Sequence, residues 1–129
     1  MYFNQQSLEG FANAVAGRLG ITVNYAVGSP CTDGTTVTLP LVSGSMTEFE
    51  FRGLCATAIH EAAHVFFKSC YEHVRFQKLP GSPRIRAAAY NCVIDVVDET
   101  AIMSFLPGAQ RLLNDHILQT IDQIGRAHV

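Results

Sequence analysis

Two histidines and a glutamate lie close together near the middle of the chain, in the pentapeptide His60-Glu61-Ala62-Ala63-His64. On an α-helix, residues four apart lie on one face, so both imidazoles can reach a single metal ion. Glu61 lies beside them, where a carboxylate can take a proton from an attacking water. This H-E-x-x-H pattern is typical of hydrolytic zinc sites, in which the histidines bind Zn²⁺ and the glutamate is the general base.

The residues around this pentapeptide are apolar, which predicts that the segment is buried (Ile59, Ala62, Ala63, Val65, Phe66 and Phe67). Buried imidazoles and carboxylates need partners, because burying an unpaired polar group is costly. A metal ion supplies a partner for both imidazoles. The alternative is an ordinary helix in a helical domain that binds no metal. We favour the metal site because of the apolar setting.

A catalytic zinc site needs a third protein ligand and one open position. The next predicted helix carries Asp95, Asp98 and Glu99 among valines and isoleucines, where a solvated acidic face is less natural. Asn91, Asp95 and Glu99 share a face at four-residue spacing. One carboxylate can therefore bind zinc while another hydrogen-bonds to a metal-bound histidine. Asp98 lies about 100° around the helix from Glu99. Spacing alone does not choose the ligand among the three carboxylates.

The apolar pattern also predicts the elements that must position these groups. We expect helices over residues 7–18, from 47 to 73 or 76, from 83 to about 105, and over 109–123. Residues 21–27 and 35–42 alternate as strands and are expected to pair as a hairpin. Thr47 with Glu50 has the spacing of a capping box, and Ser82-Pro83 is a typical helix start. The predicted class is α+β, mostly α, with a small N-terminal sheet packed on the histidine-bearing helix.

Three further expectations concern packing. The helix from residue 83 should turn an apolar face inward, made of Tyr90, Val93, Ile94, Val97 and Ala101. The last helix should do the same with Leu112, Leu113, Ile117 and Ile121. Ser7 is expected to cap the first helix, Pro40 to end a strand or lie at an edge, and Gly53 to be closely approached by a neighbour.

Composition limits the function classes. The chain has 129 residues, of which 48% are hydrophobic and 16% charged, with a net charge of −2, so we expect one globular domain. Nothing in this balance favours nucleic acid or an anionic membrane surface. The longest apolar runs fall short of the ~20 residues that a membrane span needs, and the N-terminus lacks a signal peptide pattern. The four cysteines form no C-x-x-C and are expected to be reduced thiols in a cytoplasmic protein.

Three motifs in order resemble the metallopeptidase-like region of CobT-like proteins. They are Arg52-Gly53 before the pentapeptide, then Asn91-x-x-x-Asp95-x-x-x-Glu99, then Leu106-Pro107-Gly108-Ala109. These proteins are cobalamin-biosynthesis or cobaltochelatase subunits, many of them from phages or bacteria. The similarity spans residues 52–114. An H-E-x-x-H alone is shared by unrelated peptidases, whereas the three motifs in this order are more specific.

The resemblance implies a zincin-like zinc metallopeptidase that acts on a protein or peptide. It favours Asp95 as the third ligand and Glu99 as a hydrogen-bond partner of a histidine. The strand over residues 35–41 would then be the edge along which substrate pairs. The chain departs from the family at Ile94, often an acid there, and at Val97, often a basic residue. The alternative function is a non-catalytic or regulatory subunit of a cobalt chelatase-like assembly with an AAA+ partner.

The end of the chain reads differently from the rest. Residues 124–129, IGRAHV, resemble a translated sequencing adaptor. We therefore expect the domain to span residues 1–123 and residues 124–129 to be a non-native tail. Full-length relatives usually continue into a von Willebrand A-type domain, so we expect the natural protein to be longer.

Overall fold

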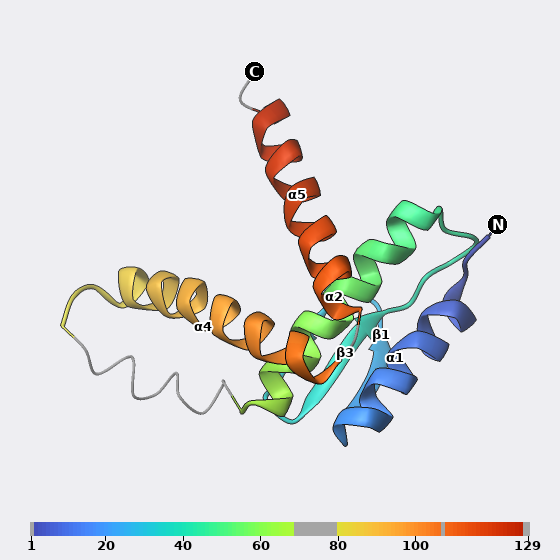
Figure 1. The fold of residues 1–129 in the computed structure, drawn as a ribbon, viewed down its shortest axis with the longest axis horizontal. Coiled ribbons are helices and arrows are strands. Elements are labelled where there is room, and N and C mark those ends of the chain that lie inside the picture. The colour runs from blue at the N-terminus through green and yellow to red at the C-terminus, as the bar shows by residue number, and fades with distance from the viewer. Residues whose placement is uncertain (1, 69–79, 107, 128–129) are drawn as a thin grey trace.

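The computed structural model describes residues 2–68, 80–106 and 108–127. Its elements are α1 (Gln5–Leu19), β1 (Thr22–Ala26), β2 (Cys31–Thr32), β3 (Thr36–Pro40), α2 (Glu48–Phe66), α4 (Pro83–Phe105) and α5 (Ala109–Ala127). Figure 1 shows α1, the sheet and α2 packed together, with α4 and α5 projecting from them in different directions. The fold is α+β and mostly α, as predicted.

The sheet has the strand order β1-β3-β2. β1 pairs with β3 in parallel, with Val23 opposite Val37, and β2 pairs with β3 antiparallel. The predicted hairpin between the two longer strands is therefore wrong. The loop between them contains β2, which forms the antiparallel pair instead. At its turn, the Asp33 carboxylate accepts hydrogen bonds from the backbone N–H groups of Thr35 and Thr36, which lower the pKa of Asp33.

β3 lies between β1 and β2, so both of its sides are paired. The prediction that this strand is an edge for substrate pairing is therefore wrong. Pro40 is the last residue of β3, where its missing N–H removes little from the ladder. That position agrees with the predicted end of a strand.

Helices α1 and α2 cover one face of the sheet. Alternate strand residues turn inward, among them the fully buried Val37 and Leu39. They meet Leu8 and Ala12 of α1 in the core, together with apolar residues of α2. α1 begins earlier than predicted, because Asn4 rather than Ser7 is the N-cap. The Asn4 side chain accepts from the Ser7 backbone, and the Ser7 side chain accepts from the Asn4 backbone.

The N-terminus of α2 is where the sequence predicts it, because the Thr47 side chain accepts a hydrogen bond from the Glu50 backbone N–H. The helix ends at Phe66 and residues 67–68 form a turn, with a φ of +58° at Lys68, so the predicted continuation of the helix is wrong there. The rest of the predicted helix, residues 69–76, lies outside the described residues. A Cβ built on Gly53 meets nothing within 4 Å, so the expected close neighbour is absent from the described part of the chain. Burial raises the pKa of the Cys55 thiol to about 12.

α4 begins after Ser82, which caps the Ile85 N–H, and ends at Phe105 as predicted. Its predicted apolar face is confirmed at the buried Tyr90 and wrong at two valines, while Ile94 and Ala101 are half-buried. Val93 and Val97 are more than half exposed, and the buried residues are Tyr90, Asp98 and Ile102. The reason is that the side of α4 against α2 carries carboxylates that pair with the histidines of α2.

α5 is inward-facing only near its start. Leu113 is 1% exposed, and Leu112 is partly buried against the core, as predicted. Ile117 and Ile121 are 41% and 59% exposed, so their predicted burial is wrong. The helix extends beyond the body of the protein there (Figure 1). Among the described residues, no helix is long and apolar enough to cross a membrane.

Candidate metal centre

The contact between α2 and α4 brings two histidines and an aspartate together. His60 Nε2 lies 3.1 Å from His64 Nε2. Asp95 Oδ1 lies 3.5 Å from His60 Nε2 and 3.2 Å from His64 Nε2. The two histidines come from successive turns of α2, and the aspartate reaches them from α4. Three ligand-type atoms therefore surround one point between the helices.

The other nitrogen of each imidazole is hydrogen-bonded to a carboxylate of α4. His60 Nδ1 lies 2.8 Å from Glu99 Oε1, and His64 Nδ1 lies 2.8 Å from Asp98 Oδ2. An ionised carboxylate can only accept a hydrogen bond, so each Nδ1 carries the proton and donates it. In a neutral imidazole the opposite nitrogen, Nε2, then has a lone pair and no proton.

With both imidazoles neutral, three acceptors converge with no donor between them: Nε2 of His60, Nε2 of His64 and Oδ1 of Asp95. Their mutual repulsion is relieved by a cation. Ligand bonds of 2.0–2.2 Å in a tetrahedral site place ligand atoms about 3.3–3.6 Å apart, close to the separations found here. The group could therefore hold a metal ion. Two histidines and a carboxylate suit zinc, and also iron(II).

Burial is uneven around this group. The Asp98 side chain is 2% exposed and that of His64 13%, whereas that of Asp95 is 44% exposed. The hydrogen bonds that orient the histidines are thus sheltered between the helices. The Asp95 side is open to solvent, and an open side is what a site needs if it is to admit a substrate.

Two further residues singled out in the sequence differ in their surroundings. Glu61 is half-buried, and its side chain makes no hydrogen bond or ion pair with other described residues, so its carboxylate is available for proton transfer. Asn91, one turn before Asp95, is exposed, and its side chain likewise makes no hydrogen bond within the described ranges. The structure thus brings His60, His64, Asp95 and Glu99 into one group, and leaves Asn91 outside its network.

The position of Asp98 is the one that sequence reasoning left without a role. Asp98 is the charged residue buried in the described core, and it contacts His64. A signal for it exists in the spacing. Two histidines on one helix need two orienting acceptors, and Asp98 and Glu99 follow Asp95 by three and four residues, one turn along the same side. The run Asp95-Val-Val-Asp98-Glu99 complements the run that bears the histidines.

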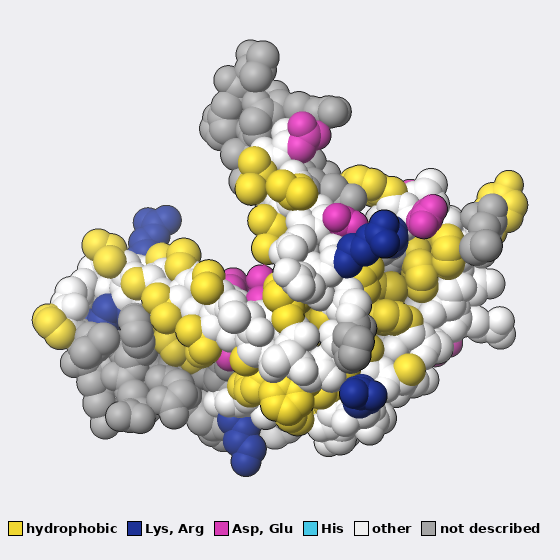
Figure 2. Space-filling model, viewed as in Figure 1, with side chains coloured by type: hydrophobic (Ala, Val, Ile, Leu, Met, Phe, Trp, Pro, Cys, Tyr) yellow, Lys and Arg dark blue, Asp and Glu magenta, His cyan; other side chains and the backbone are white. Residues whose placement is uncertain are grey.

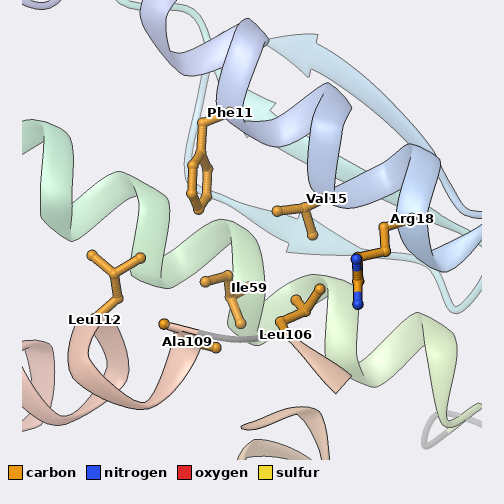
Figure 3. A pocket seen from close by; sticks show the side chains of 8 residues that line it. Phe11, Val15, Arg18, Ile59, Leu106, Ala109 and Leu112 are labelled. Carbon is orange, nitrogen blue, oxygen red and sulfur yellow. The ribbon is translucent and has the colours of Figure 1, made fainter. Parts of the chain in front are cut away.

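Helices α2 and α4, which carry the metal group, also make polar contacts with α5 and α1, and a pocket lies beside α2. An ion pair of 2.7 Å joins Arg52 of α2 to Asp115 of α5. The Arg18 side chain of α1 donates to the backbone oxygen of Phe105 at the end of α4, at 3.3 Å. A pocket of about 290 Å³ between α1, α2 and the start of α5 is lined mainly by apolar side chains (Figure 3). None of the metal-ligand candidates lines it.

Comparison with family models, with curated proteins and with solved structures finds no match for this chain.

Proposed function

We propose that the chain is a zinc-dependent metallopeptidase of the H-E-x-x-H type, with a zincin-like site. The observation that carries the proposal is the convergence of three potential ligand atoms, Nε2 of His60, Nε2 of His64 and Oδ1 of Asp95. Glu61 supports a hydrolytic role, because it is next to a ligand and its carboxylate is not engaged in the described network. The three motifs shared with CobT-like proteins point the same way.

The residues divide the work of hydrolysis. His60, His64 and Asp95 would hold Zn²⁺, while Asp98 and Glu99 orient the two imidazoles. When bound, zinc lowers the pKa of water and polarises a carbonyl. Glu61 takes the proton of the water as its oxygen attacks the carbonyl carbon of the substrate. Glu61 then passes that proton to the amide nitrogen as the C–N bond breaks, which leaves a carboxylate and an amine.

Metal analysis of the purified chain is the first test. We expect inductively coupled plasma mass spectrometry to find one zinc per chain. The variants His60→Ala, His64→Ala and Asp95→Ala should lose this zinc. Glu99→Ala should keep zinc but bind it about 10–100-fold more weakly, because it removes an orienting acceptor and no ligand. Iron in place of zinc would contradict the metal assignment. Complete loss of zinc in Glu99→Ala, together with full retention of zinc in Asp95→Ala, would show that Glu99 is the third ligand and Asp95 the orienting acceptor.

Cleavage of an unfolded protein such as casein is the second test. Glu61→Gln should retain zinc and lose activity by about 10²–10⁴-fold, the usual contribution of a general base. A wild-type chain that binds zinc but cleaves no substrate would contradict the proposed peptidase function. It would favour the alternative, a non-catalytic or regulatory subunit that works with an AAA+ partner in a cobalt chelatase-like assembly. A chain without any stoichiometric metal would contradict both functions.

A further inference from the structure

A hollow separates α4 from α5, and it differs from the rest of the surface in its chemistry. Figure 2 shows apolar side chains along both helices and acidic side chains at the base of the hollow. α4 carries three acidic residues, and the most exposed of them is Asp95, the ligand candidate on the open side of the metal group. The exposure of Asp95, among the carboxylates of α4, is the basis for relating the open side of the metal group to this hollow.

The apolar wall on α5 can be assigned by helix geometry. Leu112 lines the pocket beside α1, together with Phe11 (Figure 3). At 100° per residue, Ile121 lies about 180° around the helix from Leu112, and Ile117 about 140°. Both therefore point away from α1, toward the side on which α4 lies (Figure 1). Their exposures of 59% and 41% leave an apolar stripe on this side of α5.

The charge at the base of the hollow limits what can lie there. Glu61, Asp95, Asp98 and Glu99 contribute four formal negative charges within two facing helix segments. A divalent cation offsets two of the four, so a formal excess of two negative charges remains. Acidic groups of a ligand would be repelled by this excess of negative charge, whereas neutral and basic groups would not.

We propose that the hollow between α4 and α5 is the substrate cleft, and that it takes an extended polypeptide with apolar, non-acidic side chains beside the bond to be cut. The inference rests on the proposed peptidase function, which it extends to a substrate class. The apolar stripe on α5 binds side chains of the substrate, and the acidic base excludes Asp and Glu. Pairing along β3 has no part in this binding, because β1 and β2 already occupy both sides of that strand.

The test combines binding with cleavage. A short fluorescent peptide rich in Leu and Val, and the same peptide with Asp in their place, are titrated into the zinc-loaded chain. We expect at least about tenfold tighter binding of the apolar peptide, the discrimination that an apolar pocket usually provides. Ile121→Asp should lower that preference about tenfold, while Ile121→Leu should keep it. Cleavage sites mapped in casein should be flanked by apolar residues.

Val93→Asp is the matched control, since Val93 is 54% exposed and lies about 200° around α4 from Asp95. It should leave the preference unchanged. Equal binding of both peptides would contradict the proposed cleft. So would an equal change of the binding preference in Val93→Asp and Ile121→Asp. So would a dimer that Ile121→Asp dissociates, because the stripe would then be covered by a second copy. Apolar-selective binding without cleavage would contradict the peptidase function and leave the binding cleft standing.

Discussion

Helices α1 and α4 both pack against α2, yet α4 buries a charged side chain beside its apolar ones and α1 does not. α1 buries Leu8, Ala12, Ala16 and Leu19, whereas its polar Asn13 and Arg18 are exposed. α4 buries the carboxylate of Asp98 and leaves Ile85, Val93, Val96 and Val97 exposed. One helix is held by apolar contact. The other is turned so that its acidic residues meet two histidines.

The difference shows how the two contacts are stabilised. Apolar burial on α1 stabilises the fold whether or not a metal ion is bound, because the same apolar surface is removed from water in both cases. The contact of α4 places the carboxylates of Asp95, Asp98 and Glu99 against the two histidines, and this group could hold a metal ion. If a metal ion occupies this group, the contact of α2 with α4 should depend on that ion, whereas its contact with α1 should not. Four measurements would sharpen or break this comparison.

The largest effect is expected in the α1 contact. Leu8 is 0% exposed, so Leu8→Ala removes buried methyl groups and should lower the free energy of unfolding by about 2–5 kcal/mol. Val96 of α4 is 66% exposed, and Val96→Ala should change the free energy of unfolding by less than about 0.5 kcal/mol. Urea unfolding followed by circular dichroism measures both. A loss at Val96 as large as that at Leu8 would show that the outer face of α4 is covered in solution.

Metal removal should act on the α4 contact. At zinc concentrations a hundredfold above Kd, binding adds about 2.7 kcal/mol to the free energy of unfolding, and a chelator should remove that increment. Hydrogen exchange should then rise first in α4 and leave the core of α1 protected. His64→Ala should show no zinc dependence. Equal exchange changes in α1 and α4 would contradict the division between the two contacts.

Asp98→Asn tests the buried carboxylate that orients His64. The amide keeps the shape of the side chain but lacks the charge, so zinc affinity should fall by about 10–100-fold. Competition with a chelating dye measures this affinity. Asp115→Asn removes a carboxylate that pairs with Arg52 of α2, outside the metal group, and should leave zinc affinity unchanged. A similar loss in both variants would assign the effect to general destabilisation.

Local signals in the sequence predicted much of the fold. Thr47 and Ser82 mark helix starts because capping involves residues only three apart. The i, i+4 spacing of His60 and His64 predicted their convergence for the same reason. The parallel pairing of β1 with β3 could not be predicted in this way, because it depends on β2, a two-residue strand too short to show a pattern.

The remaining misses share a cause in tertiary packing. The apolar residues of α4 suggested a core face containing Val93 and Val97, but the pairing of Asp98 and Glu99 with the histidines decides which side turns inward. Which carboxylate approaches Nε2, and which approaches Nδ1, depends on the crossing of α2 and α4. Nothing in the spacing of Asp95, Asp98 and Glu99 encodes that crossing. The exposure of Ile117 and Ile121 likewise depends on where α5 extends beyond α2.

The smallest effect concerns α2 itself, which both contacts share. A Cβ at Gly53 would meet nothing within 4 Å, so Gly53→Ala should raise the free energy of unfolding by about 0.5–1 kcal/mol through helix propensity alone. Gly17→Ala in α1, with equally open surroundings, should give a similar gain. Gly20→Ala should instead destabilise by about 1–2 kcal/mol, because the C-cap of α1 has a φ of +71°. Since Gly53 belongs to neither contact, its gain should be the same with zinc and with chelator. A gain that appears only with zinc would show that the α4 contact extends along α2 to Gly53, and the two contacts would then not be independent.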